Sequence, residues 1–283
     1  MSPAAIIPIT FSAALVNGAL GYGFSSMTVP LALLILSNRA LNPALVPIEV
    51  VLNAHLLWVN RRALSAVTRR MLPVVIGLVP GVIAGTVVLA RVTPSWLKLA
   101  TYIALLPLIL VQASGFRRPV RSERTAGGVF GFGLGALYSV TTISGPPLAI
   151  ALKNQGYSAQ EFRAALGLVR LAESTLTAIA YGAAGLFAGD SIALIPLMLP
   201  GIVVGVPIGA AMIARMQADT FRRVCISFDA WVVAFGISTL LRELRIVTGP
   251  AAFTVLAAVA AVDAVLLYRY VTMNAALAGK VRP

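Results

Sequence analysis

Two apolar segments of this chain carry the same interruption, 117 residues apart. Residues 18–32 read GALGYGFSSMTVPLA, and residues 135–149 read GALYSVTTISGPPLA. Each segment combines glycine, small hydroxyl residues and proline, which weaken a helix unless a break in the backbone is wanted there. Two broken apolar helices at matching places in two halves of a chain are typical of secondary transporters.

The composition places these segments in a membrane. The chain has 283 residues, of which 59% are hydrophobic and 11% are charged, and its mean hydropathy is +0.93. Soluble proteins carry about a quarter charged residues, so this composition indicates a polytopic membrane protein. Most of the apolar stretches reach the roughly 20 residues that a helix needs to cross the hydrocarbon core. They run at 3–36, 43–60, 71–90, 95–115, 125–152, 164–187, 190–214, 220–241 and 249–271.

The charge pattern fits the same class of protein. A net charge of +13 would suggest nucleic acid as the partner of a soluble protein. Here the arginines lie between the apolar stretches, as the positive-inside rule requires of cytoplasmic loops, so no nucleic acid is expected. The single cysteine, Cys225, excludes an intrachain disulfide, and the single histidine, His55, excludes a histidine pair for a metal. We therefore expect no enzyme activity, no cofactor and no metal.

A second repeated motif defines the two halves. Gly81 and Gly85 correspond to Gly205 and Gly209, 124 residues further along the chain. Glycines four residues apart form a groove that a neighbouring helix can enter, so packing is their expected role rather than substrate contact. The predicted organisation is a first repeat at 1–115, a cytoplasmic arginine-rich linker at 116–124, a second repeat at 125–241, and an extra helix with a tail at 242–283.

The basic residues predict how the two halves are oriented. If all nine stretches cross the membrane, ten lysines and arginines lie on one side and eleven on the other. If each broken segment enters and leaves on one side, the first from outside and the second from inside, sixteen lie inside and five outside. Membrane proteins show such an excess. We therefore expect an all-α fold of two inverted repeats, each a glycine-rich broken-helix hairpin plus three transmembrane helices, with one extra C-terminal helix. The count does not distinguish a re-entrant hairpin from two short crossings.

The broken segments supply the first candidates for substrate contact. The N-terminus of a half-helix carries partial positive charge and free N–H groups, so a break can hold an anion. Side-chain hydroxyls would add donors there, or they would bond back to carbonyls of their own helix and ease the bend. The hydroxyl candidates are Ser25, Ser26, Thr28, Ser139, Thr141, Thr142 and Ser144, and the expected backbone breaks are at Gly21, Gly23 and Gly145.

Arg170 is the most informative single residue, because it lies inside an apolar stretch. An arginine at the centre of a membrane helix costs about 2.5–3.5 kcal/mol on insertion scales, so it should face a partner or a cavity. Its guanidinium suits an oxyanion, but Glu173 on the same helix face could also neutralise it. In the first half, Asn53 corresponds to Arg170 at the 117-residue spacing. We expect Arg170 and Asn53 to contact the substrate.

Acidic residues within apolar stretches are the candidates for ion coupling. A buried carboxylate must be paired or protonated, so Glu49 and Glu173 are candidate proton carriers. Glu49 could equally lie exposed near the outer surface. Asp229 and Asp263 are expected to pair with residues of neighbouring helices.

These features resemble the TauE/SafE family of sulfite and organosulfonate exporters, and the resemblance covers nearly the whole chain. Members carry a G-x-x-x-G-x-G-G-G segment that leads into a proline in each of two homologous halves. The first copy here runs from Gly18 to Pro30, and the second runs from Gly131 to Pro146. The triple glycine is replaced by Gly-Phe-Ser-Ser in the first copy and by Ser-Val-Thr-Thr in the second. Membership implies transport of a small sulfur-containing anion.

The sequence and the resemblance together lead to one hypothesis and several alternatives. The hypothesis is a secondary transporter that exports sulfite, thiosulfate or an organosulfonate by alternating access across the inner membrane of the cell. Export needs no coupling ion, because an inside-negative potential drives anions outward by about 2.3 kcal/mol per charge per 100 mV. The alternatives are proton- or sodium-coupled uptake and a passive anion channel, while a membrane-embedded enzyme is disfavoured. The oligomeric state stays open, with a homodimer as one option.

Overall fold

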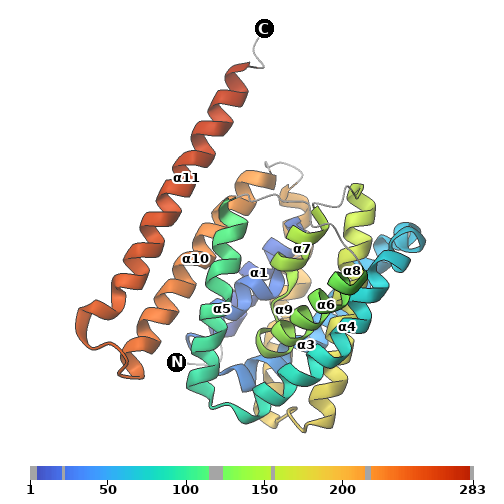
Figure 1. Ribbon diagram of the computed structural model, residues 1–283, viewed down its shortest axis with the longest axis horizontal. Helices are drawn as coiled ribbons and strands as arrows, with labels where there is room; N and C mark the ends of the chain where they lie inside the picture. Colours follow the sequence, from blue (N-terminus) through green and yellow to red (C-terminus); the bar gives the residue numbers. More distant parts are fainter. Residues whose placement is uncertain (1–4, 21–22, 115–123, 154–156, 214–217, 281–283) are drawn as a thin grey trace.

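The computed structural model describes residues 5–20, 23–114, 124–153, 157–213 and 218–280, which form helices joined by short turns (Figure 1). The first five helices are α1 (Ile6–Leu20), α2 (Phe24–Ala32), α3 (Asn38–Val59), α4 (Leu64–Arg91) and α5 (Pro94–Ser114). The next five are α6 (Arg124–Thr141), α7 (Gly145–Lys153), α8 (Ala159–Ala183), α9 (Gly189–Ile213) and α10 (Ala218–Glu243), and α11 (Thr254–Lys280) is the last. The short 3-10 helices η2 (Arg61–Ala63) and η3 (Gly249–Phe253) precede α4 and α11.

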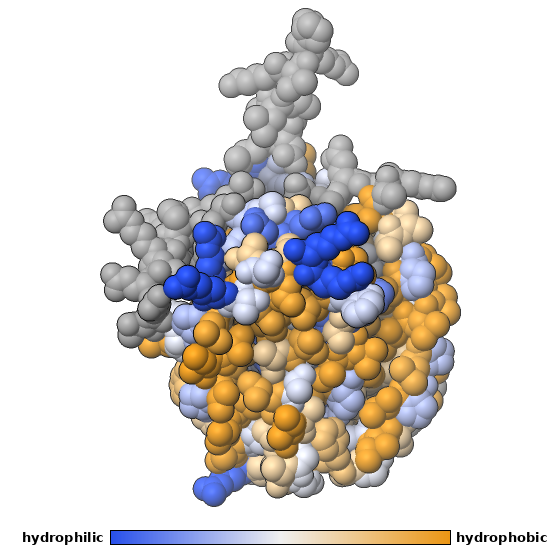
Figure 2. Space-filling view, turned by 90° about the vertical axis from the view of Figure 1, so that its right-hand side faces the viewer, coloured by the Kyte–Doolittle hydropathy of each residue, from blue (hydrophilic) through white to orange (hydrophobic). Residues whose placement is uncertain are grey.

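The outer surface of this bundle is apolar. Within the described residues, α3, α4, α5, α9, α10 and α11 are long and apolar enough to cross a membrane. Large apolar side chains such as Ile76 on α4 and Val203 on α9 are exposed. Figure 2 shows hydrophobic side chains over most of the visible face, with hydrophilic ones gathered toward its upper end. Such a surface would not be stable in water, and the chain is a multi-pass membrane protein.

The two sets of five helices follow the same plan, in which a broken pair precedes three long helices. The short helices α2 and α7 have nine residues each. At 1.5 Å per residue each is about 14 Å long, which is roughly half of the hydrocarbon core. The helices that follow begin alike, because the side chains of Ser37 and Ser158 each accept a hydrogen bond from the backbone N–H three residues later. The predicted all-α fold is confirmed, and both breaks lie in the predicted segments.

Each half packs its helices against the other half. Helix α1 lies along α9, and its counterpart α6 lies along α4. In the same way α3 contacts α9 while α8 contacts α4, and α2 contacts α10 while α7 contacts α5. The helix pairs α3–α8 and α5–α10 join counterparts directly. These contacts keep their pattern when the two sets of helices are exchanged.

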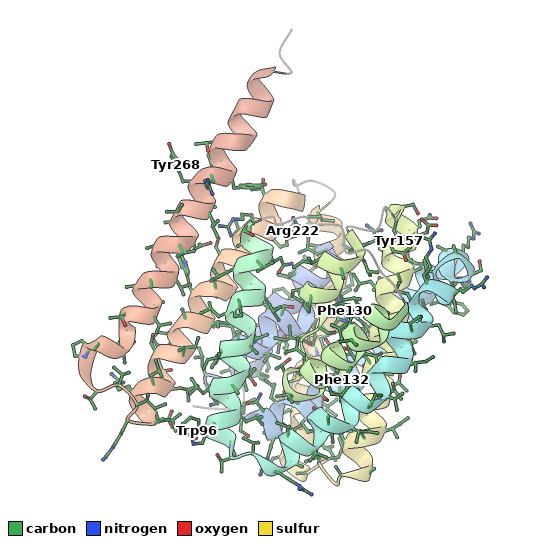
Figure 3. The ribbon with its side chains drawn as sticks, in the orientation of Figure 1. Trp96, Phe130, Phe132, Tyr157, Arg222 and Tyr268 are labelled. Atoms are coloured by element: carbon green, nitrogen blue, oxygen red, sulfur yellow. The ribbon has the colours of Figure 1, made fainter. Side chains whose placement is uncertain are left out.

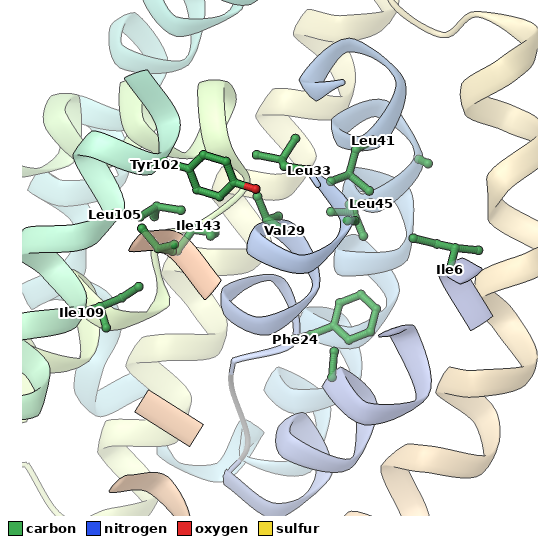
Figure 4. Packing of buried hydrophobic residues seen from close by; sticks show 14 of the residues in the cluster. Ile6, Phe24, Val29, Leu33, Leu41, Leu45, Tyr102, Leu105, Ile109 and Ile143 are labelled. Carbon is green, nitrogen blue, oxygen red and sulfur yellow. The ribbon is translucent and has the colours of Figure 1, made fainter. Parts of the chain in front are cut away.

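The short helix α2 is held by an apolar core between the two halves. The core includes Val29 and Ala32 of α2, Leu45 of α3 and Val233 of α10. Figure 4 shows part of it, where the Tyr102 ring of α5 lies close to Val29. The Tyr102 hydroxyl donates a hydrogen bond of 2.8 Å to the carbonyl of Pro30. Apolar packing on several sides fixes where the first broken segment ends.

Glycines set the close approach of the helix pairs α4–α6 and α1–α9. A Cβ at Gly81 would overlap the carbonyl oxygen of Phe132, and a Cβ at Gly209 would overlap that of Leu15. A Cβ at Gly205 would lie 2.7 Å from the Cβ of Ala14. The packing role predicted for these glycines is confirmed, and each contact joins one half of the chain to the other.

Two glycines on α6 allow a matched test of this packing. A Cβ at Gly131 would overlap the carbonyl oxygen of Val74 on α4, whereas a Cβ at Gly133 meets nothing within 4 Å. We expect Gly131→Ala to destabilise the protein by about 1–3 kcal/mol through overpacking. Gly133→Ala should be neutral or stabilising by up to about 1 kcal/mol, because alanine favours helix. Thermal unfolding in detergent measures both, and equal midpoints for the two variants would contradict the close packing of α4 and α6.

The extra helix α11 stands at the edge of the bundle. It packs mainly against α10, and its C-terminal part extends beyond the other helices (Figure 1). A buried ion pair attaches it, because Arg223 Nη2 on α10 lies 2.7 Å from Asp263 Oδ1 on α11. The Ser227 hydroxyl donates to the same oxygen at 3.2 Å. The pairing predicted for Asp263 is confirmed.

Candidate functional site

The two chain breaks lie at equivalent places and share a left-handed backbone. Gly23, the N-cap of α2, has φ +102°, which glycine adopts without strain. In the second break, Thr142 has φ +56°, a conformation that costs a β-branched residue about 1–3 kcal/mol. Gly23, one of the predicted breaks, directly precedes α2. Gly145 is the first residue of α7, so the second break lies just before it, and Gly21 lies outside the described residues.

The carbonyl groups that the second break leaves free at the end of α6 have side-chain donors. Asn42 Nδ2 donates to the carbonyl of Val140 at 2.7 Å, and the Tyr181 hydroxyl donates to the carbonyl of Ser139. Thr141 accepts a hydrogen bond from the backbone N–H of Ile143 at 3.1 Å. Without water in the hydrocarbon core, these side chains take over the missing helix bonds. The break is therefore a built feature of the fold.

An ion pair between the two halves lies beside the breaks. Arg170 Nη2 on α8 is 2.8 Å from Glu49 Oε1 on α3, and the two residues are only 3% and 1% exposed. Each lies twelve residues after the serine that caps its helix, Ser37 or Ser158, near the middle of the helix. Glu49 is thus the structural counterpart of Arg170, and the possible position of Glu49 at the outer surface is wrong. The sequence-based pairing of Arg170 with Glu173 missed this partner.

The Glu49 carboxylate has two further donors. The Ser25 hydroxyl of α2 donates to Oε1, and the Tyr138 hydroxyl of α6 donates to Oε2 at 2.6 Å. Tyr138 is fully buried and was not among the predicted site residues. The signal was present, because Tyr138 stands where the first copy of the repeat has Gly21. Donors from three helices thus converge on a single carboxylate.

A second buried carboxylate lies on the same face of α8. Glu173 Oε2 accepts a hydrogen bond from the Ser144 hydroxyl, which lies at the start of α7. Within the described part of the chain, no hydrogen-bond partner is present for Glu173 Oε1, Arg170 Nε or the Thr177 hydroxyl. Ser144 and Ser25 therefore play equivalent parts, because each joins a chain break to a glutamate on a long helix.

Most of the remaining predicted site residues bond to backbone carbonyl groups. Ser139 and Thr141 donate hydrogen bonds to the carbonyls of Gly135 and Leu137 in their own helix, at 2.8 and 2.7 Å. This is the alternative to substrate contact that the sequence left open for these hydroxyls. Thr142 donates to the carbonyl of Thr141, and Asn53 Nδ2 lies 3.4 Å from the carbonyl of Arg170. Among the described residues, the Thr28 hydroxyl has no hydrogen-bond partner.

A small cavity lies beside the two breaks. Ser26 and Asp229 line it together with Gln112, Ile143 and Pro146. Asp229 is 8% exposed, and its Oδ1 atom has no hydrogen-bond partner in the described part of the chain. We expected Asp229 to pair with a neighbouring helix, but no such partner is found for its Oδ1 atom among the described residues.

The arrangement can bind an oxyanion. A guanidinium and several hydroxyl groups converge at the level of the two breaks, and free N–H groups at the start of α2 add partial positive charge. The start of α7 offers only the N–H of Gly145, because Pro146 and Pro147 have none. All of these groups are buried, so electrostatic contacts with an anion would be weakly screened. The site is formed by both halves.

Comparison with known proteins identifies the family of this chain. The profile described as "Sulfite exporter TauE/SafE" matches residues 6–237, which include both halves and both breaks. Searches of curated proteins and of solved structures found no significant match. Because the profile covers most of the 283 residues, the chain belongs to the sulfite exporter TauE/SafE family.

Proposed function

We propose that this protein is a secondary transporter that exports a small sulfur-containing oxyanion across the inner membrane. Sulfite, thiosulfate and organosulfonates are the candidate substrates, in line with the family. The observation that carries the proposal is the buried Arg170 guanidinium, which lies against Glu49 and has a free Nε donor among the described residues. An arginine fork matches the oxygen atoms of sulfite or a sulfonate.

The packing of α3 on α8 supports alternating access by two inverted repeats. Val46 clusters with Tyr181, whereas Leu57 meets Gly167, so later residues of α3 meet earlier residues of α8. Two equivalent helices that cross the membrane and run antiparallel are related by an axis in the membrane plane. Exchange of the two conformations then turns a site open to one side into a site open to the other.

The distribution of charged ends supports the same topology. Arg70 lies over the Tyr157 ring at 5.6 Å, and Tyr157 and Arg222 lie at one end of the bundle, opposite Trp96 (Figure 3). The loop before α4, the start of α8 and the start of α10 are thus at one end, which we assign to the cytoplasm. The nine-residue helices α2 and α7 favour re-entrant hairpins over two short crossings.

Cysteine labelling tests this topology. In a Cys225→Ser background, Gln160→Cys should react with a membrane-impermeant maleimide only from the cytoplasmic side, and Ala188→Cys only from outside. Both residues are exposed; Gln160 lies at the start of α8, and Ala188 lies in the connection after its end. Reaction of Gln160→Cys from the periplasmic side of intact cells would contradict the inverted arrangement.

Flux measurements test the transport function. Protein in proteoliposomes loaded with sulfite, thiosulfate or methanesulfonate should release at least one of them with saturation and counterflow. Current without saturation would indicate the passive channel instead. Chemical conversion of the anion without any flux would indicate an enzyme. Sodium outside the vesicles should leave the rate unchanged, because we assign export to the anion site and not to a sodium gradient.

A further inference from the structure

The donors at the proposed anion site are occupied by a carboxylate of the protein itself. Glu49 Oε1 accepts hydrogen bonds from Arg170 and Ser25, and Oε2 accepts one from Tyr138. A guanidinium and two hydroxyl groups from three different helices are also the donor set that an oxyanion requires. The Glu49 carboxylate thus stands where the substrate would bind.

The charges in the site explain why this matters for transport. Two carboxylates, Glu49 and Glu173, surround the single guanidinium of Arg170, and all three residues are buried. An anion that entered with both carboxylates ionised would add a third negative charge at low dielectric, where like charges repel strongly. Removal of one negative charge is therefore a condition for tight binding.

We propose that Glu49 is a proton-operated competitor of the substrate anion. When Glu49 takes up a proton from the aqueous side that the site faces, it releases Arg170, Ser25 and Tyr138, and the anion binds to them. When the anion leaves, the proton returns to water and the ionised carboxylate holds the donors again. This inference rests on the proposed function, because it assigns a regulation to the same anion site.

The hydrogen bonds of Glu49 distinguish it from the other charged groups of the site. The titratable and charged groups near it are Arg170 and Glu173 on α8 and Tyr138 on α6. Helix α2 contributes Ser25, and α5 contributes Tyr102, whose hydroxyl is bonded to Pro30. The buried side chains of α4 and α9 in the described chain are apolar, glycine, threonine or serine. Among the described residues, Glu49 is the carboxylate that pairs with the guanidinium, whereas Glu173 Oε2 accepts a hydrogen bond from Ser144.

One proton should therefore accompany each anion through the membrane. For a singly charged sulfonate the transported pair is neutral, so the membrane potential no longer drives it. Export then follows the combined concentration gradients of the anion and the proton, so acid on the side of entry favours it. This consequence separates the present inference from simple potential-driven export.

Calorimetry on the purified full-length protein tests the proposal. We would titrate methanesulfonate and thiosulfate, which keep their charge across the pH range used, into the protein in two buffers of different ionisation enthalpy. The difference in heat gives the protons taken up on binding. The wild type should take up about one proton per anion, and its apparent affinity should fall about tenfold per pH unit on the alkaline side.

Three variants complete the test. Glu49→Gln should still bind the anion, with no proton uptake and less than about a twofold change in affinity per pH unit. Glu161→Gln, at the exposed start of α8, is the matched control and should behave as the wild type, because glutamine also fits its capping box. Arg170→Ala should not bind the anion.

Each outcome decides one of the two proposals. Binding by the wild type without proton uptake would overturn the role of Glu49 and leave the anion site intact. Proton uptake that persists in Glu49→Gln would also overturn it. Binding by Arg170→Ala, or no binding of either anion by the wild type, would overturn the proposed site and the inference that rests on it.

Discussion

Replacement of Arg170 by alanine is expected to abolish anion transport. The guanidinium is buried between the two halves and is paired with Glu49 at 2.8 Å. Removal of one partner of a buried charge pair costs about 3–5 kcal/mol of interaction free energy. The same loss in anion binding would lower the affinity for the anion roughly a hundredfold or more. Arg170→Lys keeps the charge but loses the planar fork, so it should retain weak transport. Uptake of labelled sulfite into proteoliposomes measures both variants.

The single alanine variant also strands the Glu49 carboxylate, and a second variant removes this complication. Arg170→Ala combined with Glu49→Gln removes both partners of this ion pair and should be more stable in detergent than Arg170→Ala alone. We expect this double variant to be folded and inactive. Substrate-dependent flux through it would show that Arg170 only stabilises the fold.

Replacement of Asp263 by alanine is expected to have the largest effect on stability. Asp263 on α11 is buried and receives Arg223 Nη2 and the Ser227 hydroxyl. Arg223 is also buried, and its Nε and Nη1 atoms have no hydrogen-bond partner in the described part of the chain. Removal of the carboxylate should therefore destabilise the protein by about 3–5 kcal/mol. Thermal unfolding in detergent measures the loss.

A double variant distinguishes the lost ion pair from lost packing. Arg223→Met with Asp263→Leu should be close to the wild type in stability or above it, because apolar residues of similar size replace both charges. Asp190→Asn, at the exposed start of α9, should change stability little and serves as the control. A double variant as unstable as Asp263→Ala would assign the effect to packing.

The repeat offsets explain why the candidate site could be predicted only in part. The offset of 117 residues pairs Asn53 with Arg170, but the serine caps of α3 and α8 give an offset of 121 and pair Glu49 with Arg170. The glycine pairs of α4 and α9 are 124 residues apart. The two halves differ by a few residues in successive connections, so no single offset aligns them throughout.

By itself, the sequence determined the membrane class of the protein, its apolar helices, the two broken segments and the unusual burial of Arg170. Those features follow from local properties: apolar length, the helix-breaking effect of glycine and proline, and the cost of a charge in lipid. Only the tertiary structure decided that Glu49 pairs with Arg170 and that Ser25 and Tyr138 complete its contacts. Helix spacing fixes which residues share a face, but the helix that opposes this face depends on how closely the halves approach. That approach is set by the glycine contacts of α4 with α6 and of α1 with α9. The residue pattern within a single segment does not specify which helix these glycines will meet.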